Sequence, residues 1–132
     1  MLTIAEASSA EPSPAIWKPE SSQATIPTVA AARTLNAAGF SVSLDHLGEH
    51  VSDPRLAEQS RDDYLACLDQ IEASGLDANV SVKLTQLGLA LDRELTLGNL
   101  KQIAERAAAV GTTVTVDMED SPYTDATLDI YE

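Results

Sequence analysis

Three short stretches of alternating apolar and polar residues constrain the fold of this chain more than any other feature. They cover residues 40–45, 79–85 and 113–117, and each carries a charged residue at or near its end. Alternation with a period of two residues predicts β-strands. The strands recur about every 35 residues, which is the spacing of repeated βα units. The pattern therefore predicts an α/β protein with about three parallel strands.

Helical stretches separate these strands. They are predicted over residues 28–38, 54–74 and 96–110, with the beginning of a further helix over residues 125–132. Asp53 is the predicted N-cap of the second helix, and Gly75 is its predicted stop. Thr28 is the predicted N-cap of the first. The helices supply the connections that parallel strands require.

The first 24 residues differ from the rest in composition. They are rich in Ser, Ala and Pro, and Pro12, Pro14 and Pro19 exclude a long helix. We expect a low-complexity, disordered extension over residues 1–24 and one α/β domain over residues 25–132.

Charged residues from the three strands are expected to meet at one end of the sheet. Right-handed crossovers place the carboxyl ends of parallel strands on the same side, where α/β enzymes hold their chemistry. Lys83 lies among apolar residues, and a buried ammonium is costly unless it is paired. Asp45 and Asp117, at the ends of the other two strands, are matching partners for Lys83, and Asp117 from the neighbouring strand is its predicted counter-ion.

Composition excludes several classes of function. The net charge of −13 and the pI near 4.3 argue against binding to nucleic acid or to anionic membranes. The single cysteine, Cys67, permits neither an intrachain disulfide nor a thiolate zinc site, and its apolar neighbours favour a place in the core. No apolar run approaches the ~20 residues of a membrane span, and no secretory signal is recognisable. A cytoplasmic location is predicted.

Three sequence blocks carry a resemblance to a known family. They are Leu-Asp-His-Leu-Gly-Glu at 44–49, Val-Ser-Val-Lys-Leu-Thr-Gln-Leu-Gly-Leu at 80–89, and the segment beginning Val-Asp-Met-Glu-Asp-Ser-Pro-Tyr-Thr at 116–128. In sequence, order and spacing the chain resembles the flavin-dependent proline dehydrogenases of the monofunctional bacterial type, from about residue 25 onward.

The resemblance implies a flavin-holding (β/α)8-type barrel that oxidises L-proline to 1-pyrroline-5-carboxylate in proline catabolism. The implied cofactor is FAD, and the implied electron acceptor is a quinone or another carrier, which places the enzyme peripherally at the inner membrane face. By the resemblance, Lys83 lies near the flavin and the proline carboxylate, and Asp117 helps to order the active site. Glu49 matches a glutamate that pairs with a distant arginine and gates the site.

The chain holds only part of such a barrel. Eight strands and about 250 residues are typical of the complete fold. The arginine pair that clamps proline in the family, and most of its flavin contacts, come from later strands without a counterpart here. We therefore expect the N-terminal portion of a barrel, inactive alone, that self-associates or pairs with a missing C-terminal portion.

Two other interpretations stay open. Asp45, Glu49, Asp117 and Glu119 would suit a hard divalent cation, and Lys83 would suit Schiff-base chemistry, as in a β/α aldolase or isomerase. Alternatively, the chain is a non-catalytic, self-associating fragment. Simpler expectations also exist for single residues: a loop carboxylate for Asp45, a helix cap for Glu119 with Asp120, structural histidines at 46 and 50, and a surface position for Tyr123.

Overall fold

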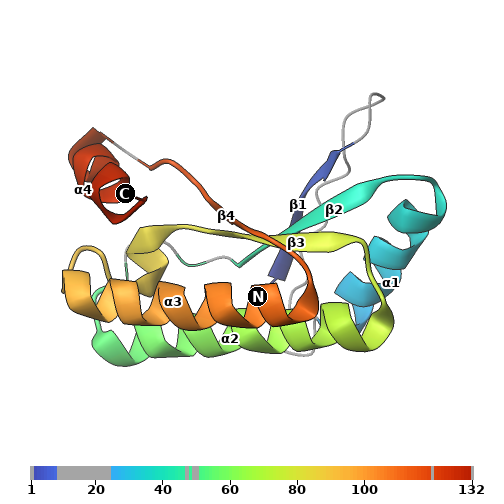
Figure 1. Ribbon diagram of the computed structural model, residues 1–132, viewed down its shortest axis with the longest axis horizontal. Helices are drawn as coiled ribbons and strands as arrows, with labels where there is room; N and C mark the ends of the chain where they lie inside the picture. The colour runs from blue at the N-terminus through green and yellow to red at the C-terminus, as the bar shows by residue number, and fades with distance from the viewer. Residues whose placement is uncertain (1, 9–24, 47, 49–50, 120, 132) are drawn as a thin grey trace.

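The computed structural model describes residues 2–8, 25–46, 48, 51–119 and 121–131 (Figure 1). Its elements, in chain order, are β1 (Leu2–Ser8), α1 (Thr25–Ala37), β2 (Ser41–His46), α2 (Pro54–Ser74), β3 (Ala78–Val82), the 3-10 helix η1 (Leu84–Leu87), α3 (Arg93–Val110), β4 (Val114–Val116) and α4 (Ser121–Tyr131).

The strands form one sheet in the order β1-β2-β3-β4. β2, β3 and β4 are parallel, with Leu44 beside Val80 and Val80 beside Val114. The predicted α/β architecture with three parallel strands is confirmed. The arrangement is consistent with part of a barrel, whereas the barrel type itself stays a prediction.

β1 corrects the expectation of disorder over residues 1–24. Leu2–Ser8 pairs antiparallel with β2, with a shift of register between Ile4 and Glu6. The outer edge of β2 would otherwise present unpaired backbone groups, and an extended segment satisfies them. The prolines that suggested disorder all follow residue 8. Residues 9–24 lie outside the described part of the chain.

Helix boundaries follow local capping. The Asp53 side chain accepts a hydrogen bond from the Arg55 N–H at 2.8 Å, and Gly75 ends α2 with φ +61°, so the prediction over 54–74 is confirmed. α3 begins earlier than predicted because Asp92 caps it, accepting hydrogen bonds from the backbone of Glu94 and Leu95. α1 begins at Thr25, so the prediction of Thr28 as N-cap was wrong.

The hydrophobic core lies between the sheet and the α2–α3 pair. Both helices run along the same side of the sheet in Figure 1. The strands contribute Val42, Leu44, Val80 and Val82, α2 contributes Tyr64, Cys67, Leu68 and Ile71, η1 contributes Leu84 and Leu87, and α3 contributes Ile103 and Ala107. Cys67 is buried, as predicted, and burial raises its pKa to about 12, which keeps the thiol protonated.

The opposite face of the strands is polar. We call it the polar face and define it by Ser43, Asn79, Ser81 and Thr115, which alternate with the core residues. The Asn79 amide donates a hydrogen bond to the Thr115 hydroxyl at 3.0 Å, across β3 and β4. Followed toward the carboxyl ends of the strands, this face leads to Asp45, Lys83 and Asp117.

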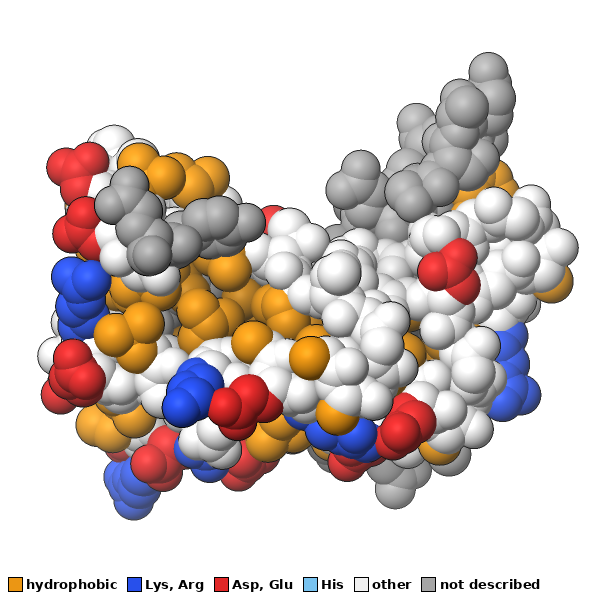
Figure 2. Space-filling view, viewed as in Figure 1, with side chains coloured by type: hydrophobic (Ala, Val, Ile, Leu, Met, Phe, Trp, Pro, Cys, Tyr) orange, Lys and Arg blue, Asp and Glu red, His pale blue; other side chains and the backbone are white. Residues whose placement is uncertain are grey.

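A hollow of about 350 Å³ lies between β4 and α4. Val114, Val116, Met118 and Leu128 line it together with Thr115 and Thr127, and hydrophobic side chains gather there in the space-filling view (Figure 2). Met118 and Leu128 are exposed. No helix in the described part of the chain is long and apolar enough to cross a membrane.

Candidate active site

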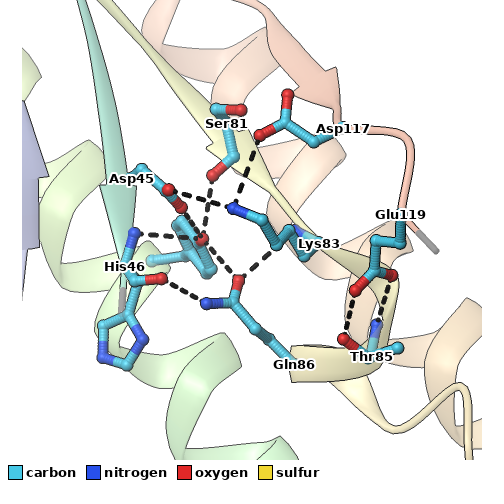
Figure 3. Close-up of polar contacts among 9 residues, drawn as sticks. Asp45, His46, Ser81, Lys83, Thr85, Gln86, Asp117 and Glu119 are labelled. Carbon is cyan, nitrogen blue, oxygen red and sulfur yellow. Dashed lines mark hydrogen bonds and ion pairs between the residues drawn. The ribbon is translucent and has the colours of Figure 1, made fainter. Parts of the chain in front are cut away.

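Lys83 lies directly after β3, at the carboxyl end of the parallel strands (Figure 3). Its side chain is 22% exposed. The ammonium Nζ is 3.3 Å from Oδ2 of Asp45 and 3.7 Å from Oδ2 of Asp117. The predicted contact between Lys83 and Asp117 is present. Asp45, the other matching aspartate, for which a loop carboxylate was the simpler expectation, is the nearer of these two partners.

Strand register explains why these three side chains meet. Asp45 is beside Ser81 in the β2–β3 pairing, and Val82 is beside Val116 in the β3–β4 pairing. Lys83 and Asp117, one position further along β3 and β4, are therefore level with each other, and Asp45 is level with Ser81, two positions before Lys83. The backbone N–H of Asp117 donates a hydrogen bond to the Val82 carbonyl at 2.9 Å, which continues the pairing past the end of β4.

A buried tyrosine beneath the ion pairs was missed by the sequence analysis. Tyr64 projects from α2, is fully buried, and places its hydroxyl 2.8 Å from the Ser81 carbonyl oxygen. The same hydroxyl is 2.9 Å from Oε1 of Gln86 and 3.3 Å from Oδ1 of Asp45. Burial, reinforced by the Asp45 charge, raises the pKa of Tyr64 far above its ordinary value, so the phenol stays protonated. Tyrosine on an apolar helix stripe was the available signal, because a buried phenol needs a partner.

Glu119 has a different role from the one expected. Its carboxylate accepts hydrogen bonds from the Thr85 backbone N–H, at 3.1 Å, and from the Thr85 hydroxyl. This pair joins the segment after β4 to η1. The expectation that Glu119 caps the following helix overlooked Thr85, which lies 34 positions earlier in the chain.

His46 is buried beside the site and is paired with α2. Its Nε2 lies 2.9 Å from Oδ2 of Asp63. Burial lowers the pKa of His46, while the Asp63 charge opposes the shift without reversing it. Tyr123 is half-buried on α4. Glu49 and His50 lie outside the described residues, so the gating role of Glu49 stays a prediction.

The lowered pKa of His46 predicts a pH dependence of stability. Below the unfolded pKa of about 6.5, the unfolded chain binds a proton that the folded chain resists. The free energy of unfolding is therefore expected to have its full value above that pH and to decline as the pH falls from about 6.5 toward 5. Urea titrations at several pH values measure this slope. His46→Gln should flatten it and His50→Gln is the matched control; an unchanged slope in His46→Gln would assign the dependence to other groups.

The metal-dependent interpretation finds no support among the residues that the structure describes. There, no group of three or more His, Cys, Asp or Glu side chains could hold a metal ion. The Lys83 ammonium instead lies near both Asp45 and Asp117. Two neighbouring carboxylates suit an ion pair better than a Schiff-base lysine, which is activated by desolvation or by a neighbouring cation.

Comparisons with known proteins agree with the motifs. A family model described as proline dehydrogenase matches residues 28–132. Proline dehydrogenase 2 of Bacillus subtilis (strain 168) is 37% identical over 108 residues, which cover 82% of this chain and 35% of the relative. Proline dehydrogenase 1 of Bacillus subtilis subsp. natto is 35% identical, covering 75% and 33%. Proline dehydrogenase of Deinococcus radiodurans is 31% identical, covering 76% and 34%. The chain spans about a third of the length of these relatives.

Proposed function

Because the chain belongs to the proline dehydrogenase family, we propose that it forms the N-terminal part of an FAD-dependent enzyme that oxidises L-proline to 1-pyrroline-5-carboxylate. The observation that carries the proposal is the half-buried Lys83 ammonium beside Asp45 and Asp117 at the carboxyl ends of parallel strands. Sites of α/β enzymes lie at this end of the sheet.

The charges of the site suit a zwitterionic amino acid. Lys83 offers a cation for the proline carboxylate, and charge-assisted hydrogen bonds of this kind are among the stronger polar contacts. Asp45 and Asp117 hold the ammonium in place and leave the three groups with one net negative charge. A simple anion would be disfavoured by that balance, whereas the positive nitrogen of proline is favoured by it.

FAD, when bound, supplies the two-electron acceptor chemistry that no amino-acid side chain provides. Lys83 and Asp117 are the described residues that would hold its redox-active ring, since a fixed ammonium favours a ring that becomes electron-rich on reduction. In the described part of the site the carboxylates of Asp45 and Asp117 lie against the Lys83 ammonium, and the Glu119 carboxylate, hydrogen-bonded to Thr85, adds a further negative charge. That balance does not suit a diphosphate, which other parts of the protein would have to bind.

We propose that the 132 residues alone are inactive and are completed by further polypeptide. Support comes from the third of the relatives' length that the chain spans, and from the exposed Met118 and Leu128 side chains at the hollow beside β4. A C-terminal portion or a second copy of the chain would cover Met118 and Leu128. Electrons would pass to a quinone or another carrier, with the protein cytoplasmic and peripheral at the inner face of the membrane.

The test is the visible spectrum after incubation with FAD and gel filtration. The 132-residue chain alone is expected to elute colourless. A chimera in which it replaces the matching third of Bacillus subtilis proline dehydrogenase 2 is expected to retain flavin, and L-proline should bleach the flavin band.

Bleaching by D-proline is the matched control and should be absent or much slower. A folded chimera that retains flavin but ignores L-proline would contradict the proposed activity. A flavin band on the 132-residue chain alone would contradict the proposed inactivity of that chain.

A further inference from the structure

We propose that Tyr64 is a positioning residue for Lys83: its buried hydroxyl orients the Asp45 carboxylate, and Asp45 in turn holds the ammonium. The inference deepens the proposed function, and its meaning for catalysis rests on that function. The contacts among Tyr64, Asp45 and Lys83 are features of the fold and do not depend on the proposed activity.

The two oxygens of Asp45 have different partners. Oδ1 faces the Tyr64 hydroxyl at 3.3 Å, while Oδ2 faces Nζ of Lys83 at 3.3 Å. The Asp45 side chain is 12% exposed, so water contributes little to its orientation. A hydroxyl on one side and an ammonium on the other therefore fix the plane of the carboxylate.

The Tyr64 hydroxyl also fixes the strand ends that carry this pair. It accepts a hydrogen bond from the His46 backbone N–H at 3.2 Å, next to Asp45 in β2. It lies 2.8 Å from the Ser81 carbonyl oxygen in β3. A single hydroxyl on α2 is thereby joined to the two strands whose ends present Asp45 and Lys83.

Gln86 extends the same network to the backbone of Lys83. Its Oε1 lies 2.9 Å from the Tyr64 hydroxyl and accepts a hydrogen bond from the Lys83 N–H at 3.3 Å. Its amide nitrogen donates to the His46 carbonyl oxygen. The phenolic proton has several acceptors within reach, and the shared network sets the position of both charged residues.

The apolar role of Tyr64 does not require the hydroxyl. Phenylalanine would fill the same fully buried volume against the core. A hydroxyl placed there must be hydrogen-bonded, and its partners are the strand ends that build the site. Tyr64→Phe therefore separates the positioning function from packing.

Competitive acetylation of the 132-residue chain measures the effect without flavin or proline. The modification of Lys83 is followed by mass spectrometry relative to Lys101, whose side chain is 76% exposed and serves as internal standard. Loss of the Tyr64 hydroxyl frees Asp45 to rotate, which weakens its hold on the ammonium. Acetylation requires the uncharged amine, so its rate follows the fraction of Lys83 in that form. We expect the relative rate at Lys83 to rise about threefold or more in Tyr64→Phe.

A double-variant cycle assigns the effect to Asp45. Tyr64→Phe should raise the Lys83 rate in the parent chain and leave it unchanged in the Asp45→Asn background, because the path through the carboxylate is already broken. Tyr123→Phe is the matched control and should have no effect. An unchanged rate in Tyr64→Phe, or an equal rise in both backgrounds, would overturn the proposal. Because the assay contains no substrate, its failure is distinguishable from failure of the proposed activity.

A second measurement keeps Tyr64 intact, in case Tyr64→Phe does not fold. Tyrosine labelled with ¹³C at Cζ gives a resonance that reports on the hydrogen bond of each hydroxyl. Asp45→Asn is expected to shift the Tyr64 resonance, whereas Asp117→Asn, which removes a charge beside the same ammonium, should shift it less. Equal shifts would mean that Tyr64 senses charge in general, and the positioning role would then be refuted.

Discussion

Replacing Lys83 by alanine is expected to abolish the bleaching of bound flavin by L-proline and to destabilise the fold. Truncating one member of a hydrogen-bonded charge pair costs about 2–5 kcal/mol in binding, which predicts a loss in kcat/KM of about thirtyfold to several thousandfold. The FAD-loaded chimera supplies this readout. Lys101→Ala, which removes an exposed i,i+4 pair with Glu105, is the matched control. It should change neither the bleaching by L-proline nor the free energy of unfolding appreciably.

The stability of the same variant can be measured whether or not flavin binds. Without Lys83, the mostly buried Asp45 loses a charged partner, and the free energy of unfolding should fall by about 1–3 kcal/mol in urea titrations. Adding Asp45→Asn should restore part of that loss, since the remaining side chain is uncharged, but should not restore the response to proline. Recovery of proline bleaching in the double variant would contradict the role of Lys83 in binding substrate.

Leu68→Ala is expected to have the largest effect on folding. Leu68 is fully buried on α2 between the sheet and α3, and truncation of such a residue costs about 2–5 kcal/mol. Domains have a total stability of about 5–15 kcal/mol, so the variant should lose a large fraction of its free energy of unfolding and melt at a lower temperature. Far-UV circular dichroism during thermal and urea unfolding provides the measurement.

Leu128→Ala is the matched control, because Leu128 is also helical but is 50% exposed beside the hollow. A cost of well under about 1 kcal/mol is expected. If Leu128→Ala costs as much as Leu68→Ala, the hollow is covered in the isolated chain, and self-association would then have to be measured directly.

The features that were correctly predicted depend on neighbours in the sequence. Asp53 and Gly75 are adjacent to the ends of α2, and the apolar alternation around Val80 and Val82 is visible within one strand. Such signals arise from capping and periodicity, which act over a few residues. The placement of Lys83 near Asp117 also followed, because parallel strands bring their carboxyl ends together.

The features that were missed depend on residues far apart in the sequence. Tyr64 contacts Asp45, Ser81 and Gln86, and the separations are 19, 17 and 22 positions. The residues next to Tyr64 in the sequence give no sign of these contacts. β1 was missed for a related reason, because its pairing depends on the free edge of β2 rather than on its own composition.

Strand order within the sheet repeats strand order along the chain. Each strand pairs with the one synthesised immediately before it, so no early strand must wait for a distant partner. During translation, β2 and α2 emerge before β3, and α3 emerges before β4. Synthesis proceeds at about 5–20 residues per second. In this topology the pairing edge for each new strand belongs to the strand made just before it, so no strand has to be inserted between two that are already paired.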